Sequence, residues 1–130
     1  MENIHWKKAE ELAERKLKKE FRKKFIKNDI RIGNRAWNFD LVSENEPEDK
    51  RIIAQVKSCG KRFETQTVYQ LETLFKRDYL FDCLLLEKAK GYKKFFFLVS
   101  DKKLFNEFKY WSKGLISPEV KLRFIDAWRG

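Results

Sequence analysis

The stretch that most constrains the fold of this chain is residues 37–60, where polar side chains interrupt two short apolar runs. Residues 39–42 (FDLV) and 52–56 (IIAQV) have the length and apolar character of β-strands. The polar segment between them contains Pro47 and is typical of a turn. The stretch is therefore predicted to form an antiparallel β-hairpin.

Three polar side chains of this hairpin are expected to lie on one face. With the turn centred near Pro47, antiparallel pairing places Asp40 opposite Gln55, and directly opposite residues have Cβ atoms about 5 Å apart. Alternation along a strand puts Lys57 on the same face as Gln55. Burying an amide or a lysine in mid-strand without partners costs on the order of 2 kcal/mol or more. Such residues therefore indicate polar partners or a functional role. A one-residue slip in register would move Asp40 away from the other two.

Composition predicts a single domain over residues 1–130, located in the cytoplasm. At this length about two-thirds of the unfolded surface can be buried, and 42% of the residues are hydrophobic. No apolar run approaches the roughly 20 residues of a membrane span, and the N-terminus lacks a signal-peptide core. Cys59, Cys83 and His5 form no CxxC pair or Cys/His cluster, which argues against a structural zinc site or a disulfide framework.

Positive charge is the strongest compositional signal. The chain has 30 Lys and Arg residues against 20 Asp and Glu, for a formal net charge of +10. Because an excess this large attracts polyanions, nucleic acid is the expected partner. No membrane partner is expected, since no apolar run is long enough to span a bilayer. The alternative is that the lysines only keep the protein soluble.

Helices and further strands are predicted on both sides of the hairpin. Apolar residues at intervals of three and four from Ile4 to about Phe25 indicate an amphipathic helix, with Glu10 at the border of its apolar stripe. Strands are predicted over 29–32 and 120–125, and helices over 65–77 and 102–111, the last capped by Ser100 or Asp101. Runs 81–86 and 95–100 are most simply a second hairpin; the alternative is that the helix continues through CLLLEKA.

This arrangement resembles the PD-(D/E)XK nuclease superfamily, which includes type II restriction endonucleases and archaeal Holliday junction resolvases. The resemblance covers roughly residues 6–100. Residues 9–17 (AEELAERKL) are similar to the first helix, where the family places a glutamate; Glu10 is the best match and Glu14 the fallback. Residues 39–41 are similar to the family's hydrophobic-Asp-hydrophobic strand. Residues 54–58 (AQVKS) are similar to its (D/E)-x-K element, with Gln55 where the acid usually stands.

The resemblance implies an α/β fold with a restriction endonuclease-like core (αβββαβ), in which helices flank a central mixed sheet. It also implies a Mg²⁺-dependent endonuclease, with Mn²⁺ as a substitute. Asp40, Glu10 and the carbonyl oxygen of Gln55 would supply hard oxygen ligands, and Lys57 would orient the attacking water or stabilise transition-state charge. An amide at position 55 removes one negative charge and should weaken cation binding, although active relatives with Gln at this position are part of the family picture.

The resemblance further implies a DNA substrate and a homodimer or larger nuclease complex. The residues expected to contact nucleic acid are Lys7, Lys8, Lys61, Arg62 and Gln70. Two other functions stay open: a non-catalytic nucleic-acid-binding module on the same scaffold, and a protein-interaction subunit with an acidic partner. A structure in which Asp40 and Lys57 point to opposite sides of the sheet, or in which Glu10 lies far from both, would end the nuclease proposal and leave the basic surface as the only guide to a role.

Overall fold

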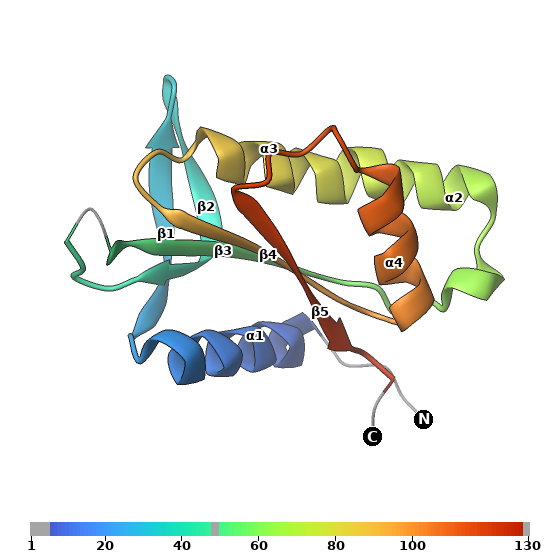
Figure 1. Ribbon diagram of the computed structural model, residues 1–130, viewed down its shortest axis with the longest axis horizontal. Helices are drawn as coiled ribbons and strands as arrows, with labels where there is room; N and C mark the ends of the chain where they lie inside the picture. Colours follow the sequence, from blue (N-terminus) through green and yellow to red (C-terminus); the bar gives the residue numbers. More distant parts are fainter. Residues whose placement is uncertain (1–5, 48–49, 129–130) are drawn as a thin grey trace.

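The computed structural model describes residues 6–47 and 50–128, which form an α/β fold around one open, mixed sheet (Figure 1). The five strands lie in the order β1-β2-β3-β4-β5. Strands β1 to β3 pair antiparallel, whereas β3, β4 and β5 run parallel. Their bounds are β1 Phe25–Ile32, β2 Arg35–Ser43, β3 Ile52–Ser58, β4 Lys93–Ser100 and β5 Val120–Asp126.

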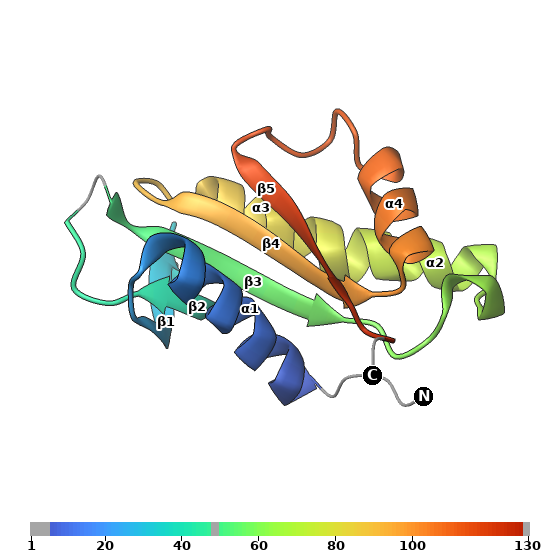
Figure 2. The same ribbon diagram turned by 60° about the horizontal axis from the view of Figure 1, so that its bottom comes forward.

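Helices cover both faces of the sheet. The helix α1 lies on one face, and α2, α3 and α4 lie on the other (Figures 1 and 2). Their bounds are α1 Trp6–Phe21, α2 Val68–Thr73, α3 Phe81–Lys88 and α4 Lys102–Trp111, with a 3-10 turn η2 at Phe63–Thr65 and a π-helical segment η3 at Leu74–Leu80. In the part of the chain described, no helix is both long and apolar enough to cross a membrane.

Each face of the sheet has its own hydrophobic core. Ala9, Ala13 and Leu17 of α1 recur every four residues, as the apolar spacing predicted, and are buried against β3 and β4. On the other face, the core of α3 and α4 includes Cys83 and Phe108. The β3 and β4 side chains alternate between the two cores, so the middle of the sheet is apolar on both sides.

The hairpin of β2 and β3 is confirmed, and so is its register. Leu41 pairs with Ala54 and Val42 with Ile53, and continuing this register places Asp40 opposite Gln55. The first helix ends earlier than predicted, because Arg22 has a φ of 55° and the chain then enters β1 at Phe25.

The predicted second hairpin is wrong, and the alternative of a continued helix is confirmed. Residues 81–88 form α3, directly after η3. An apolar run of six residues does not distinguish a buried strand from a buried helix by its period alone. Here Tyr79, Cys83 and Leu86, spaced by four and three residues, all pack into the same core, and this burial favours the helix.

Candidate active site

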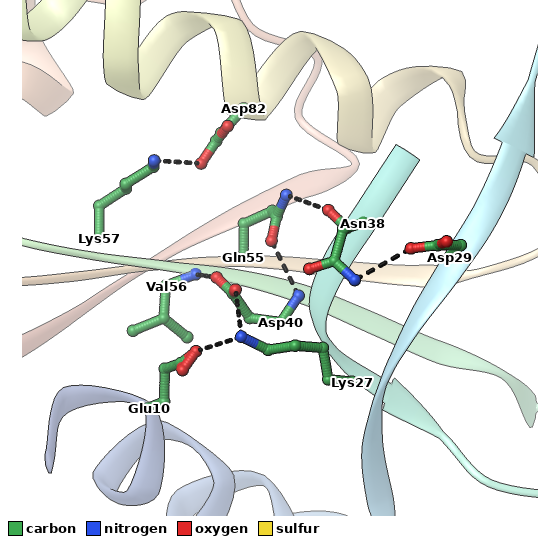
Figure 3. Close-up of polar contacts among 9 residues, drawn as sticks. All are labelled: Glu10, Lys27, Asp29, Asn38, Asp40, Gln55, Val56, Lys57 and Asp82. Atoms are coloured by element: carbon green, nitrogen blue, oxygen red, sulfur yellow. Dashed lines mark hydrogen bonds and ion pairs between the residues drawn. The ribbon is translucent and has the colours of Figure 1, made fainter. Parts of the chain in front are cut away.

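The candidate site lies where β2 and β3 separate, and three side-chain hydrogen bonds bridge the gap (Figure 3). Gln55 Oε1 accepts from the backbone N–H of Asp40 at 3.0 Å, and Gln55 Nε2 donates to the Asn38 carbonyl at 3.3 Å. Asp40 Oδ2 accepts from the backbone N–H of Val56 at 2.8 Å. These bonds replace the backbone ladder, which explains why a 5% exposed amide is tolerated in mid-strand.

A β-bulge in β2 directs Asp40 toward α1. The pairing of β1 with β2 changes register between Ile26↔Val42 and Asn28↔Phe39, so Asp40 and Leu41 together oppose Lys27. A bulge of this kind breaks the alternation of side chains. Phe39 therefore packs into the α3-side core and Leu41 into the α1-side core, although they are two residues apart.

Two carboxylates meet one ammonium group on the α1 side. Lys27 Nζ lies 3.1 Å from Glu10 Oε1 and 3.8 Å from Asp40 Oδ1. The Glu10 and Asp40 side chains are 20% and 21% exposed, whereas that of Lys27 is 51% exposed. The more sheltered carboxylates thus share a cation that reaches them from solvent. Glu14, the fallback for the helix glutamate, instead forms an ion pair with Lys18 at 2.8 Å.

The pKa of the Asp40 carboxyl is raised above its ordinary value, chiefly because burial disfavours its charged form. The hydrogen bond from the Val56 N–H lowers this pKa, and the charge of Glu10 raises it. The positive charges of Lys27 and Lys57 also lower the pKa of Asp40, but each by less than burial raises it. The site thus concentrates negative charge in a partly buried space, where a cation stabilises the ionised carboxylates.

Lys57 does not join Asp40, which corrects the expectation that Asp40, Gln55 and Lys57 share one face and meets the first of the two conditions set against the nuclease. The Lys57 ammonium lies 3.5 Å from Asp82 Oδ2 of α3, on the opposite side of the sheet from α1 (Figure 3). The register was as predicted, but the bulge at Asp40 turned that side chain away. Lys57 still acts on Asp40 electrostatically, because its charge lowers the pKa of that carboxyl.

Asp82 is the site residue that the sequence analysis missed. It is 7% exposed, and burial raises the pKa of its carboxyl to about 6, with the charge of Lys57 lowering this pKa and that of Asp40 raising it. A carboxylate inside the apolar run FDCLLL was the available signal. Because residues 81–86 were assigned to a strand, nothing placed Asp82 beside Lys57.

The residues expected to contact nucleic acid fall into two groups. Lys8 lies on α1 near the candidate site and is exposed, while the side chain of Lys7 lies outside the described part of the structure. Lys61 and Gln70 line a hollow of about 390 Å³ beyond the end of β3. The Arg62 guanidinium lies 4.2 Å from the centre of the Trp128 ring.

Gln70 also has a structural role. Its Oε1 accepts from the Thr67 N–H at 2.9 Å, and its own N–H donates to Thr67 Oγ1 at 3.1 Å. This reciprocal pair is a capping box at the start of α2. Gln70 is therefore held in place by the helix it begins.

The donor set at Glu10 and Asp40 fits a hard divalent cation better than a transition metal. Among the described residues, no group of three or more His, Cys, Asp or Glu side chains is arranged to hold a metal ion. Mg²⁺ does not need three such side chains, since it usually binds through one or two carboxylates and completes its shell with water and substrate phosphates. Gln55 Oε1 already accepts one hydrogen bond, so it could offer only its second lone pair.

The structure thus assigns the chain to the α/β class and brings Glu10 to Asp40, while it places Lys57 with Asp82. Comparison with known protein families, curated proteins and solved structures found no match to this chain.

Proposed function

We propose that this chain is a Mg²⁺-dependent endonuclease that hydrolyses phosphodiester bonds in DNA, with Mn²⁺ able to replace Mg²⁺. The observation that carries the proposal is the meeting of Glu10 and Asp40 around one cationic group at the point where β2 and β3 separate. The order of elements, one helix, three antiparallel strands, a helical segment and a parallel strand, supports a restriction endonuclease-like core.

Each residue of this site has a role that follows from its position. Glu10 and Asp40 would hold the metal, which when bound neutralises charge on the phosphate and lowers the pKa of a bound water. The backbone of Val56 fixes one Asp40 oxygen at 2.8 Å and leaves the other for the cation. Gln55 fixes the Asp40 backbone through its N–H. Lys27 must move aside, which its half-exposed side chain permits.

Lys57 and Asp82 form a charge pair on the far side of the gap. For Lys57 to orient the attacking water beside Asp40, its ammonium has to leave Asp82. The Lys57 side chain is 40% exposed and can reorient, whereas that of Asp82 is 10% exposed and remains in place. Because Lys57 and Asp40 point to opposite sides of the sheet, the proposed nuclease requires this reorientation of Lys57, whose charge would then stabilise the transition state beside Asp40.

Cleavage of a panel of linear, branched and single-stranded DNA, with Mg²⁺, Mn²⁺ or EDTA, tests the proposal. We expect cleavage with either metal, none with EDTA, and a loss of at least about 100-fold for Asp40→Ala or Glu10→Ala, because each removes a metal ligand. Glu107→Ala is the matched control, since Glu107 is an exposed glutamate of α4 that does not line the hollow beside Glu10 and Asp40. An Asp40→Ala protein that cuts at the wild-type rate would rule out this site.

A second candidate is a non-catalytic nucleic-acid-binding module. This function is favoured because lysines already pair with the carboxylates that a metal would use. Lys27 pairs with Glu10 and Asp40, and Lys57 pairs with Asp82. Under this function no substrate is cut and binding is unchanged by EDTA. The third function, a protein-interaction subunit, predicts that calorimetry detects neither Mg²⁺ nor nucleic-acid binding.

A further inference from the structure

A basic groove lies at the free edge of the sheet, away from the candidate active site. It is a hollow of about 660 Å³ that extends between the C-terminal ends of α1 and α4 and along β5. Because β5 is the last strand in the sheet order, one of its edges has no strand paired to it among the residues that the structure describes. The charged residues of this groove are Glu20, Lys93, Lys109, Lys113, Lys121 and Arg123.

Some of these charges are held in place by the fold. Arg123 donates two hydrogen bonds to the Glu20 carboxylate, at 3.0 and 3.1 Å, and its guanidinium lies 4.8 Å from the centre of the Phe95 ring. Lys93 lies 5.2 Å from the centre of the Phe21 ring. Packing against aromatic rings holds both cations in place over an apolar surface.

The other lysines of the groove are free. Lys109, Lys113 and Lys121 are exposed, and none of them forms an ion pair with any carboxylate of the described residues. Five cationic side chains thus converge on the groove from β4, β5, α4 and the segment after α4, against one carboxylate, Glu20. Like charges repel when brought together, so this gathering favours an anionic occupant.

The groove is distinct from the candidate active site. Glu10, Asp40 and Lys57 do not line it. Glu10 and Glu20 are on the same helix, and ten residues correspond to about 15 Å along its axis. Successive phosphates of one strand of a duplex lie about 3.4 Å apart along the axis, so one DNA molecule is long enough to contact both places.

We propose that this groove binds the phosphodiester backbone of a nucleic-acid strand. Its volume suits a nucleotide-sized segment, and the clustered lysines suit phosphates, which carry one charge each. An acidic peptide paired with the edge of β5 is the other occupant to consider. It is disfavoured because strand addition takes its specificity from alternate positions along one strand, whereas these cations come from several elements. The choice of nucleic acid rests on the proposed function, but cleavage does not enter the test.

Fluorescence anisotropy with a labelled DNA oligonucleotide in EDTA tests the groove, because EDTA prevents metal-dependent cleavage. The groove variant combines Lys109→Gln, Lys113→Gln and Lys121→Gln. Each lost phosphate contact should reduce the slope of log K against log salt by about 0.9, so the slope should fall by about 2 to 3. We expect affinity to fall about tenfold or more at low salt. Glu20→Gln should act in the opposite direction and raise affinity several-fold.

A control variant of equal charge combines Lys76→Gln, Lys88→Gln and Lys90→Gln, which are exposed and outside the groove. It should lose less affinity than the groove variant and keep the wild-type salt slope. Equal losses in both variants would overturn the proposal, because binding would then follow net charge alone. Competition by a poly-glutamate peptide as effective as that by unlabelled DNA would also overturn it. Groove-dependent binding in EDTA, together with no cleavage of the same DNA when Mg²⁺ or Mn²⁺ is added, would refute the proposed nuclease and leave the groove standing.

Discussion

At the scale of single residues, Lys27 controls access to the Glu10–Asp40 pair. Its ammonium occupies the position between the two carboxylates that a divalent cation would take. Lys27→Met removes that competitor and leaves the carboxylates in place. We expect the variant to bind Mn²⁺ about 1.5- to fivefold more tightly, because an exposed ion pair of this kind is worth about 0.2–1 kcal/mol. Isothermal titration calorimetry measures this directly.

The control for this experiment is Lys90→Met, an exposed lysine outside the site. It changes the net charge equally and should leave Mn²⁺ affinity near that of the wild type. If the Lys27→Met protein binds Mn²⁺ no better than this control, the ammonium does not compete with the metal. The same comparison in an Asp40→Ala background should show no gain, since one of the two ligands is absent.

The expected register was confirmed, but side-chain direction at Asp40 was not predictable from the sequence. With the turn near Pro47, Asp40 was expected opposite Gln55, although the sequence alone does not exclude a one-residue slip of the hairpin. The bulge opposite Lys27 left no sequence signal, since neither Asp40 nor Leu41 is a glycine. It depends on how β1 pairs with β2, which is a property of the assembled sheet.

At the scale of elements, Asp101 connects two parts of the chain. Its Oδ1 accepts from the Leu104 N–H and caps α4, while its Oδ2 accepts from the Phe63 N–H of η2, each at 2.7 Å. Asp101→Ala removes both bonds. We expect the free energy of unfolding to fall by about 2 to 3 kcal/mol, from a lost cap of about 1 kcal/mol and a backbone N–H left without its partner. Urea denaturation measures the change.

The conservative variant Asp101→Ser separates the two contributions. Serine can still cap α4, but its single oxygen cannot also reach Phe63. Its loss of stability should therefore lie between those of the wild type and Asp101→Ala. Equal losses in the serine and alanine variants would mean that the α4 cap contributes little and that the contact with η2 dominates.

The wrong assignment of residues 81–86 to a strand has a physical cause, which is the lack of a helix boundary in the sequence. The sequence offers Ser100 or Asp101 as a cap, because short polar residues precede an amphipathic run, and the helix over 102–111 was predicted with its observed bounds; the structure shows that Asp101 is the cap. Residues 81–86 carry no comparable boundary, because the chain continues from α2 through η3 into α3 without a break. The π-helical turns of η3 set the direction in which α3 presents Asp82, and no local pattern indicates them.

At the scale of the whole molecule, the two cores explain why strands β3 and β4 were predictable from the sequence while the partners of the site residues were not. Apolar runs in β3 and β4 identify the centre of the sheet, which is buried on both sides. The polar residues of the site come from α1, β1, β2, β3 and α3, and only the packing of these elements on opposite faces decides which of them meet. Glu10 reached Asp40, whereas Lys57 reached Asp82.

The buried carboxyl of Asp82 should make the stability of the whole domain depend on pH. Burial raises its pKa to about 6 in the folded protein, from the ordinary value of 3.8. Between these values the folded state holds a proton that the unfolded state has released, so this contribution to stability falls as pH rises through the window. The shift corresponds to at most about 3 kcal/mol. Asp82→Asn cannot titrate and should gain stability relative to the wild type by up to that amount between pH 4 and pH 7.

Urea denaturation of both proteins from pH 4 to pH 8 tests this linkage. If the free energy of unfolding changes with pH in the same way for both proteins over that range, Asp82 has an ordinary pKa in the folded protein. Lys57→Met provides the second arm, because the charge of Lys57 lowers the pKa of Asp82 and its removal should raise that pKa. In this variant the fall in stability should therefore extend to higher pH than in the wild type. The combined Asp82→Asn and Lys57→Met protein should lose that extension, since no carboxyl remains at position 82 to titrate.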